Sequence, residues 1–287
     1  MENEISGATT LYCLLGYPAR HSISPRMHNT AFAALSLDCR YLAFEVAPED
    51  LTAAVQGLRA LGAGGFNLTM PHKNAVLPLL DQLSEAAALS GSVNTVVNEN
   101  GKLIGHTTDG IGVVRALQES GFSPAGKRIT LLGGGGAAES VLTQLALEDV
   151  AEVSVFKRNN ATFQKTADFA KKVESHTGTA VTIRPMEDTT VLADTLRSSD
   201  LLINATNVGM APQEGISLVP PDALFPELFV ADLIYHPAET KLLADAKTLG
   251  CPVMNGLPML LHQGAEAFRI WTEKEMPLDL VKKAIHQ

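Results

Sequence analysis

Four consecutive glycines at residues 133–136 end a run of β-branched and aliphatic residues at 129–132, and a helix-like stretch at 140–147 follows. Together with Ala138 they match the spacing G-x-G-x-x-G/A. Glycine permits a tight turn and a close backbone approach, and the first N–H groups of the helix then face an anion. A glycine cluster alone would indicate only a turn. Because residues 153–156 supply a second strand, the order strand, turn, helix, strand predicts a unit that binds the pyrophosphate of a dinucleotide.

The bulk composition is that of a globular protein of about two domains. The 287 residues are 46% hydrophobic and carry a formal net charge of −9, which argues against a general nucleic-acid surface. Residues 1–4 lack the features of a secretory signal, and no apolar run approaches the ~18 residues that span a bilayer. Cys13, Cys39 and Cys251 lack metal-ligand spacing. We therefore expect a cytoplasmic protein that binds no nucleic acid, no membrane and no metal.

Strand-like and helix-like segments alternate along the chain, which is typical of an α/β fold with parallel strands and helical crossovers. Strands are predicted at 11–15, 41–46, 64–69, 93–97, 153–156, 181–184, 201–204, 230–233 and 252–254. Helices are predicted at 27–35, 48–61, 84–89, 111–119, 140–147, 259–271 and 278–285. Residues 121–126 read as the clearest linker before the dinucleotide unit.

Three polar clusters interrupt the first part of the chain. The first, residues 21–25, reads His-Ser-Ile-Ser-Pro and follows a predicted strand. Alternate residues of an extended segment project to one side, so Ser22 and Ser24 can both donate to one carboxylate. The alternative reading is that Ser24 caps a helix ahead of Pro25.

The second cluster, residues 67–73, reads Asn-Leu-Thr-Met-Pro-His-Lys. It places Asn67, Thr69 and Lys73 at the carboxyl edge of a sheet, where open α/β sheets bind ligands. An isolated lysine would be read as a surface charge. His72 is a rival base, although alternation would point it away from Lys73.

The third cluster runs from Asn94 and Thr95 to residues 106–110, His-Thr-Thr-Asp-Gly. Asp109 precedes Gly110, an order that also suits a turn or a helix cap. Paired with a lysine in a cleft, however, the Asp109 carboxylate would orient the ammonium and complete an acid–base unit.

With these clusters in view, the chain resembles the shikimate dehydrogenases and, within them, the quinate/shikimate dehydrogenase branch. The resemblance covers nearly the whole chain. Beyond the three clusters it rests on motifs in the same order: Gly133 to Ala137, Asn204-Ala-Thr206, Gly209-Met210, Tyr235-His-Pro237 with Thr240, Asn255-Gly256, Met259-Leu260, Gln263-Gly-Ala265, Phe268 and Trp271.

The resemblance implies an α/β protein of two domains: an N-terminal α/β substrate domain and a Rossmann-type dinucleotide-binding domain, with the C-terminal helices packing back on the first. We expect the substrate-binding and catalytic domain at 1–112 plus about 258–287. The Rossmann domain is expected at 113–257.

The resemblance also implies a substrate site of eight residues: Ser22, Ser24, Thr69, Lys73, Asn94, Asp109, Tyr235 and Gln263. Lys73 and Asp109 would be the catalytic pair. The two serines would hold the substrate carboxylate, with Tyr235 nearby. The remaining three would hydrogen-bond the ring hydroxyls.

The implied cofactor site begins at the glycine turn, where the pyrophosphate would lie against Gly133, Gly134, Gly135, Gly136 and Ala137. The nicotinamide half would lie along Asn204, Thr206, Leu233 and Gly256, with Asn207 where the family commonly has Ser. Two further departures are Thr107, in place of the usual Asn, and Glu139 at the start of the pyrophosphate helix. A negative charge there suits the helix dipole but would oppose a phosphate if it faced inward.

Cofactor choice depends on the end of the second strand of the dinucleotide unit. An acid about 20 residues past the glycines normally accepts the ribose hydroxyls of NAD, and residues 156–160, Phe-Lys-Arg-Asn-Asn, contain none. Lys157 and Arg158 can instead pair with the 2′-phosphate of NADP, while Asn160 can hydrogen-bond a ribose hydroxyl. The alternative is that both cations are merely solvated. We expect both NADP and NAD to work, with NADP slightly favoured.

By this resemblance the protein interconverts shikimate and 3-dehydroshikimate in the chorismate pathway, and also quinate and 3-dehydroquinate. Hydride would pass between the substrate C3 and the nicotinamide C4, and the hydroxyl proton would move through Lys73 with Asp109. The alternatives are a dehydrogenase that prefers quinate, a dehydrogenase for another small hydroxy acid or a folate-type substrate, and a non-catalytic nucleotide-binding sensor. Either a monomer or a homodimer is expected.

Overall fold

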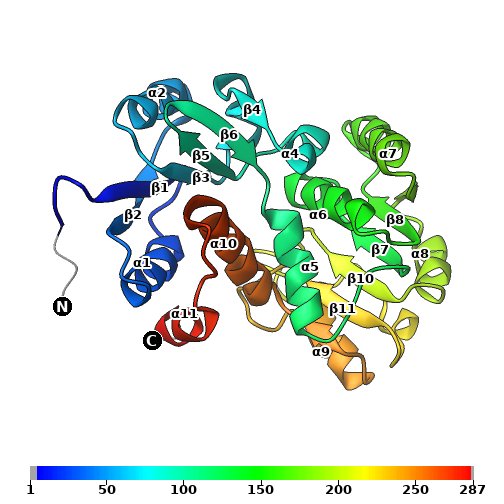
Figure 1. Ribbon diagram of the computed structural model, residues 1–287. Coiled ribbons are helices and arrows are strands. Elements are labelled where there is room, and N and C mark those ends of the chain that lie inside the picture. The colour runs from blue at the N-terminus through cyan, green and yellow to red at the C-terminus, as the bar shows by residue number, and fades with distance from the viewer. Residues whose placement is uncertain (1–4, 286–287) are drawn as a thin grey trace. The chain divides into compact units, whose positions relative to one another are not determined.

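The computed structural model describes residues 5–285, and the chain divides into two compact units (Figure 1). One unit comprises the chain up to Thr108 together with the part from Gln263 onward, and the other spans Asp109–His262. These divisions lie near the starts of the two segments expected at 113 and 258. The functional domain boundaries themselves stay a prediction.

The first unit contains a six-stranded sheet with the order β2-β1-β3-β5-β6-β4. The central strand β1 runs parallel to both of its neighbours, β2 and β3. The strands are β1 (Thr10–Gly16), β2 (Cys39–Glu45), β3 (Gly65–Leu68), β4 (Gln82–Leu83), β5 (Thr95–Glu99) and β6 (Lys102–His106).

The expectation of parallel pairing is wrong for β5, which runs antiparallel to both β3 and β6. The reason is a two-residue hairpin: Glu99 pairs with Lys102, and the residues between them, Asn100 and Gly101, have φ of 53° and 92°. Asn-Gly is the sequence that such a turn prefers, because both of its central residues need positive φ. The dipeptide was the available signal for this hairpin.

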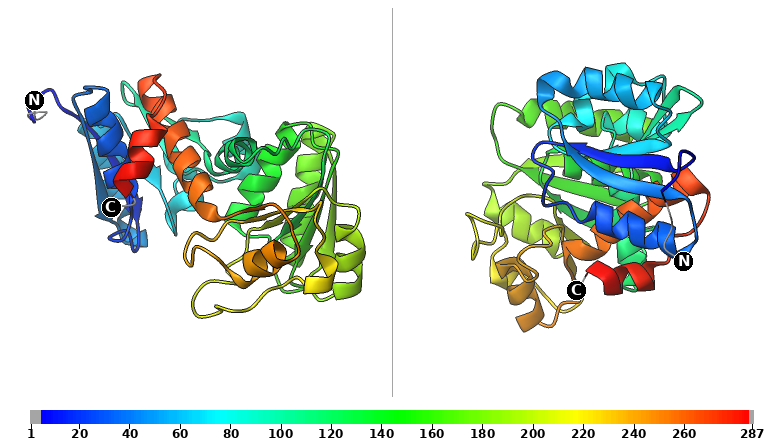
Figure 2. Two further views of the ribbon diagram at one scale, coloured as in Figure 1. Left: turned by 90° about the horizontal axis from the view of Figure 1, so that it is seen from below. Right: turned by 90° about the vertical axis from the view of Figure 1, so that its left-hand side faces the viewer.

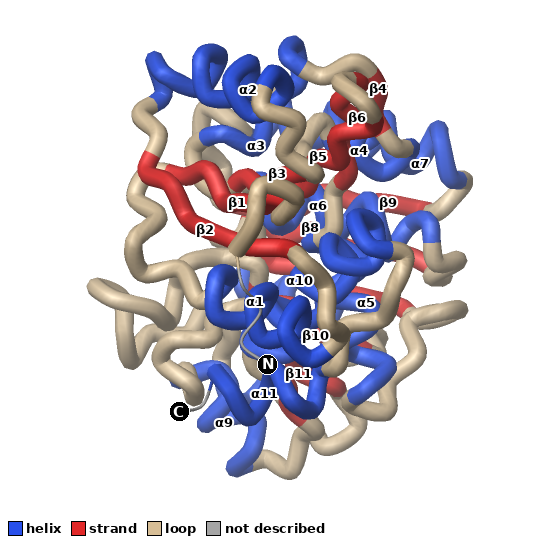
Figure 3. The backbone as a smooth tube through the Cα atoms, turned by 60° about the vertical axis from the view of Figure 1, so that its left-hand side comes forward, coloured by secondary structure: helices blue, strands red, loops and turns tan. Residues whose placement is uncertain are grey.

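Helices cover both faces of the first sheet (Figures 1 and 3). On one face α2 (Leu51–Ala60) packs Val55 and Leu58 against Cys13 and Leu15 of β1. On the other face the ring of Tyr12 lies 4.9 Å from that of Trp271 in α10. The remaining elements are α1 (Ser24–Ala34), η1 (Pro48–Asp50), α3 (His72–Ala75), η2 (Leu77–Leu79), α4 (Glu85–Ser90), α11 (Leu278–Ile285) and the part of α10 (Gly256–Thr272) from Gln263 onward.

The end of the chain returns to the first unit, as predicted. Helices α1 and α11 are in contact and lie side by side in both views of Figure 2. The Trp271 indole Nε1 donates to the carbonyl of Val96 at 2.9 Å. This approach is close enough to require glycine at 65, since a Cβ there would lie 2.4 Å from the indole nitrogen.

The second unit contains a six-stranded sheet in which every pairing is parallel, with the order β12-β11-β10-β7-β8-β9. Counted from β7 this is the order 6-5-4-1-2-3 of a Rossmann fold, which confirms the predicted fold class. The strands are β7 (Arg128–Leu132), β8 (Glu152–Lys157), β9 (Ala180–Pro185), β10 (Leu201–Asn204), β11 (Phe229–Asp232) and β12 (Val253–Met254).

Helices flank this sheet, and the loops after its strands gather at one edge. Leu132, Phe156 and Leu202 pack with apolar side chains of α8 and α9 in one core. Within residues 5–285, no helix has both the length and the apolar character that crossing a bilayer requires. The remaining elements are α5 (Asp109–Glu119), α6 (Gly136–Leu147), α7 (Phe163–Thr177), α8 (Thr189–Leu196), η3 (Pro221–Ala223) and α9 (Lys241–Thr248).

Candidate active site

The segment with Ser22 and Ser24 is a turn into α1. Ile23 has helical backbone angles (φ −84°, ψ −8°), and α1 begins at Ser24. The Ser22 hydroxyl accepts a hydrogen bond from the Ser24 N–H at 3.2 Å. The predicted extended segment with alternating side chains is therefore wrong, because the chain is already turning into α1 at Ile23. The capping alternative is also wrong, since no side chain caps α1. Both serines are half-buried, and their role as carboxylate ligands stays a prediction.

Lys73 lies on α3, a single turn of helix after β3, and is half-buried. Its carbonyl accepts a hydrogen bond from the Val93 N–H at 2.9 Å, which ties Lys73 to the residue before Asn94. The neighbouring His72 is fully buried, and its Nε2 lies 2.8 Å from the carbonyl oxygen of Val46. A carbonyl only accepts, so His72 Nε2 carries the proton and the ring acts as a fixed packing element. His72 is therefore a poor rival to Lys73 as a base.

Buried amide and hydroxyl side chains connect β2, β3 and β5. The Tyr41 hydroxyl donates to Asn67 Oδ1 at 2.7 Å. Asn67 Nδ2 in turn donates to the carbonyl of Asn94 and to Thr95 Oγ1, both at 3.0 Å. Burial raises the pKa of Tyr41 well above its usual value, and a hydrogen bond with Ser24 opposes that rise. Tyr41 is therefore a neutral donor at working pH.

Asn94 is the centre of this network and is only 3% exposed. Its Nδ2 donates to Thr108 Oγ1 at 3.0 Å and to Gln263 Oε1 at 3.4 Å. Its Oδ1 accepts from the Thr108 N–H at 2.8 Å. Asn94 thus holds the backbone from which the next residue, the buried Asp109, opens α5. The structure brings Lys73, Asn94 and Gln263 together in the first unit, with Asp109 one residue beyond it.

Thr69 lies just past the end of β3, beside the end of β1. Its N–H donates to the carbonyl of Leu15 at 3.0 Å. Its methyl group fills the space beside Gly16, where a Cβ would lie 2.3 Å from Thr69 Cγ2. The segments carrying Ser22 and Lys73 leave these same two parallel strands. Ser22, Thr69 and Lys73 therefore lie beyond the carboxyl ends of these two adjacent strands, where the sequence placed Thr69 and Lys73.

The glycine turn has the geometry that its spacing predicted. Gly133 has φ +123°, and a Cβ there would lie 2.9 Å from the carbonyl oxygen of Ala205. Gly135 is the N-cap of the 12-residue helix α6, and no atom lies within 4 Å of where its Cβ would be. Ala138 packs at 2% exposure. A tight turn, an open backbone and close helix packing are the features that fit a dinucleotide pyrophosphate.

The residues predicted to recognise the adenosine ribose lie in different environments. Lys157 is 6% exposed, and its Nζ donates to Asn160 Oδ1 at 2.9 Å and to Thr162 Oγ1 at 2.7 Å. Burial and the nearby Arg158 charge lower the pKa of Lys157. Its stem covers Gly134, where a Cβ would lie 2.5 Å from Lys157 Cδ. Arg158 and Asn160 are exposed. The Lys157 ammonium therefore stabilises this loop through these two hydrogen bonds, whereas the Arg158 guanidinium faces solvent.

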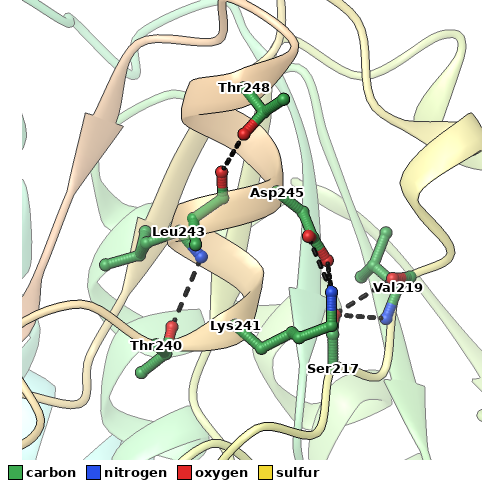
Figure 4. A network of polar contacts seen from close by, with 8 residues as sticks. Ser217, Val219, Thr240, Lys241, Leu243, Asp245 and Thr248 are labelled. Carbon is green, nitrogen blue, oxygen red and sulfur yellow. Dashed lines mark hydrogen bonds and ion pairs between the residues drawn. The ribbon is translucent and has the colours of Figure 1, made fainter.

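Sequence reasoning missed Asp232, a fully buried carboxylate at the end of β11. It accepts hydrogen bonds from Asn204 Nδ2 at 3.0 Å, the Ile234 N–H at 3.1 Å and Thr240 Oγ1 at 2.7 Å. Burial raises the pKa of Asp232, and these hydrogen bonds oppose the rise. Thr240 also caps α9 by accepting from the Leu243 N–H (Figure 4). The available signal for this buried carboxylate in the sequence was an aspartate at the end of an apolar strand.

The residues predicted for the nicotinamide half gather at the same edge of the second sheet. The Thr206 hydroxyl donates to Asn204 Oδ1 at 2.7 Å, and the Leu233 N–H donates to the Asn204 carbonyl at 3.0 Å. A Cβ at Gly256 would lie 2.1 Å from the Leu233 carbonyl oxygen, so only glycine fits there. Asn207 is exposed in the loop that follows β10.

Comparison with known proteins agrees with this arrangement. Residues 14–96 match the shikimate dehydrogenase substrate binding domain, and residues 256–286 match the shikimate 5'-dehydrogenase C-terminal domain. A shikimate dehydrogenase (NADP(+)) from Streptococcus pyogenes is 50% identical over 286 residues, which cover 98% of each chain. The chain belongs to the shikimate dehydrogenase family.

Solved structures of related proteins share the whole architecture. A shikimate 5-dehydrogenase from Listeria monocytogenes, in complex with shikimate and NAD, has a TM-score of 0.96 at 47% identity, and the match covers 98% of each chain. A quinate dehydrogenase from Corynebacterium glutamicum, in complex with NAD, has a TM-score of 0.87 at 30% identity over 97% of this chain and 99% of that one. The resemblance seen in the sequence to the shikimate dehydrogenase family is thereby confirmed.

Among the predicted substrate residues of this shikimate dehydrogenase family member, two belong to the second unit: Asp109 and the 54% exposed Tyr235. The other six belong to the first. Within residues 5–285, no group of three or more His, Cys, Asp or Glu side chains could hold a metal ion.

One departure from the family pattern, Glu139, has a structural explanation. It lies half-buried in the first turn of α6. Burial raises its pKa, while the charges of Lys165 and Lys157 lower it. Glu139 therefore interacts with these two cations, which reduces its repulsion of an anion at the glycine turn.

Proposed function

We propose that this chain catalyses the reversible oxidation of shikimate to 3-dehydroshikimate with NADP, and also accepts NAD. The observation that carries the proposal is the buried Asn94, whose amide forms hydrogen bonds with Thr108, the residue before Asp109, and with Gln263. The preceding residue, Val93, donates to the Lys73 carbonyl. The 50% identity to a shikimate dehydrogenase (NADP(+)) over 98% of both chains supports the substrate and the cofactor.

The dinucleotide supplies the hydride acceptor when it is bound. Lys73 and Asp109 act as the pair that takes the C3 hydroxyl proton, with Asp109 orienting the ammonium group. Asn94, Thr69 and Gln263 hold the ring hydroxyls, so that the carbon losing hydride has one orientation.

Ser22, Ser24 and Tyr235 bind the substrate carboxylate in this proposal, because their hydroxyl groups can donate directional hydrogen bonds to its oxygens. The glycine turn holds the pyrophosphate, supported by its open backbone at Gly135 and Gly136. Asn204, Thr206, Leu233 and Gly256 shape the nicotinamide side, where Asp232 fixes Asn204.

Quinate is the second candidate substrate, favoured by the likeness to a quinate dehydrogenase at 30% identity. Quinate keeps the carboxylate and ring hydroxyls that these residues would bind. Its extra hydroxyl at the carboxylate-bearing carbon must fit near the serine turn, so we expect weaker turnover of quinate than of shikimate.

Steady-state kinetics that cross shikimate and quinate with NADP and NAD test the proposal. The highest kcat/KM is expected for shikimate with NADP. Preference for quinate would assign the chain to the quinate-selective alternative. No turnover with any pairing, despite measurable dinucleotide binding, would favour the nucleotide-sensor alternative.

Cytoplasmic location, the domain boundaries at 112/113 and 257/258, and a monomeric or homodimeric state stay predictions. Cell fractionation, limited proteolysis and analytical ultracentrifugation test the three in turn.

A further inference from the structure

The end of β8 lacks an acid of its own, but the neighbouring strand supplies one. Strands β8 and β9 are parallel, with Lys157 opposite Pro185, so their carboxyl ends lie together. The Met186 N–H donates to the Lys157 carbonyl at 2.9 Å, which extends the pairing past the strand ends. The next residue, Glu187, therefore lies beside Arg158 and Asn159.

The Glu187 carboxylate is directed at the loop after β8. Its two oxygens lie 3.1 and 3.2 Å from the backbone nitrogen of Asn159 and share that one N–H donor. Each carboxylate oxygen can accept more than one hydrogen bond. Glu187 is exposed, so acceptor capacity remains on its solvent side.

The backbone on both sides keeps Glu187 in this position. Before it, Met186 is buried and bonded to Lys157. After it, the Asp188 side chain caps α8 by accepting from the Val191 N–H at 3.0 Å. The carboxylate is thus placed by strand pairing and by a helix cap.

The adjacent loops after β8 and β9 therefore present two opposite charges to solvent, Arg158 and Glu187. The third charge nearby, Lys157, is turned inward to Asn160 and Thr162. In a Rossmann unit this is the region where an acid accepts the ribose hydroxyls of NAD or an arginine binds the 2′-phosphate of NADP.

We propose that Glu187 is a cofactor-specificity residue: its carboxylate accepts from the adenosine ribose hydroxyls of NAD and repels the 2′-phosphate of NADP. This inference rests on the proposed function, in which both dinucleotides bind at this edge. Arg158 attracts the phosphate and Glu187 opposes it, so the two charges together keep the preference for NADP small.

Glu187→Gln tests this directly, because the amide oxygen can still accept from the Asn159 N–H while the charge is lost. Calorimetry on the full chain would measure the Kd of 2′,5′-ADP and of ADP. The affinity ratio should shift about 3- to 10-fold toward 2′,5′-ADP, as expected for one exposed charge a few ångströms away. A ratio equal to that of the parent, or shifted toward ADP, would overturn the proposal.

Two further variants separate charge from structure. Glu174→Gln removes an exposed charge from α7 near the opposite end of the strands, and it should keep the parent ratio. Glu187→Ala removes both charge and acceptor, and it should shift the ratio at least as far as Glu187→Gln. A shift in Glu174→Gln of the same size, or a shift in Glu187→Ala alone, would contradict the charge argument.

These binding measurements do not depend on turnover. A chain that shows the predicted shift but oxidises no shikimate refutes the proposed function and leaves the role of Glu187 standing. If the parent oxidises shikimate but Glu187→Gln does not shift the affinity ratio, the proposed function stands and the role of Glu187 is refuted. A parent chain that binds neither nucleotide overturns the inference about Glu187.

Discussion

Individual residues of the site differ in how firmly their neighbours hold them. Asn94 has bonds from both ends of its amide and is buried, so its orientation is set before any ligand binds. His72 is also fixed by a buried contact, since its Nε2 donates to the Val46 carbonyl. This contact gives His72 a structural role. Of the two adjacent basic residues, His72 is fixed by its bond to the Val46 carbonyl, and Lys73 stays the predicted proton-transfer residue.

Ser24→Ala tests the carboxylate site. Removing one hydrogen bond to a charged group should weaken shikimate binding by about 1.5–3 kcal/mol, seen as a raised KM. Ser24 caps no helix, so any loss of thermal stability would reflect only its hydrogen bond with Tyr41. Ser84→Ala is the matched control, since Ser84 does cap a helix by accepting from the Ala87 N–H. It should lower stability by about 0.5–2 kcal/mol and leave KM unchanged; an unchanged KM in Ser24→Ala would remove Ser24 from the site.

Arg158→Ala tests recognition of the 2′-phosphate. The exposed guanidinium can form a bidentate pair with phosphate, so KM for NADP should rise while KM for NAD changes little. Added salt should reduce the NADP preference of the parent by screening that pair. Lys157→Met should instead affect both cofactors, because the Lys157 ammonium holds Asn160 and Thr162. Equal losses with both cofactors in Arg158→Ala would refute the assignment.

Elements with a strong period or a clear boundary residue were predictable, and short ones were not. The strand, turn and helix around the four glycines follow from residue type alone. The single turn α3 and the two-residue strand β4 are too short to show a period. Their position depends on tertiary contacts such as the hydrogen bond between Lys73 and Val93.

The glycine turn allows a paired test of an element. Gly135→Ala should fold normally, because its φ of −97° suits alanine and its Cβ meets open space. The added methyl should still block the pyrophosphate and weaken dinucleotide binding about tenfold or more, ~1.4 kcal/mol. Gly133→Ala should mainly lower stability, by about 1–3 kcal/mol, because of its positive φ and the close Ala205 carbonyl. Equal dinucleotide affinity in the parent and Gly135→Ala, by calorimetry, would contradict the phosphate site.

For the whole molecule, the order of elements predicted the α/β class. The two-domain plan, the Rossmann domain and the C-terminal return were implied by the family resemblance. The sequence could not predict contacts between residues far apart in the chain. The pairing of Glu187 with Asn159 and the bonds of Asp232 arise only when neighbouring strands align their ends. Such long-range contacts leave no local pattern in the sequence.

The stability of the whole fold should depend on His28. It is completely buried against the rings of Tyr41 and Trp271, and burial lowers its pKa from 6.5 to about 3. Below pH 6.5 the unfolded chain gains a proton that the folded chain does not, so stability falls as pH decreases. The contribution is about 1.4 kcal/mol per pH unit.

Chemical denaturation of the parent and His28→Phe between pH 6.5 and 5 measures this effect. Phenylalanine can keep the ring packing without the titratable group. The parent should lose about 2 kcal/mol more than the variant over that range. Parallel stability profiles would show that His28 does not couple folding to pH.

The central claim is that Lys73 moves the substrate proton in a site that the surrounding network has already arranged. Its most direct test is kcat for shikimate oxidation in Lys73→Ala, with the shikimate Kd measured by calorimetry on the same protein. Positioned acid–base groups contribute about 10²–10⁴-fold in rate, so kcat should fall by that factor while Kd stays within about tenfold of the parent value. A variant that keeps a kcat near that of the parent would contradict the account.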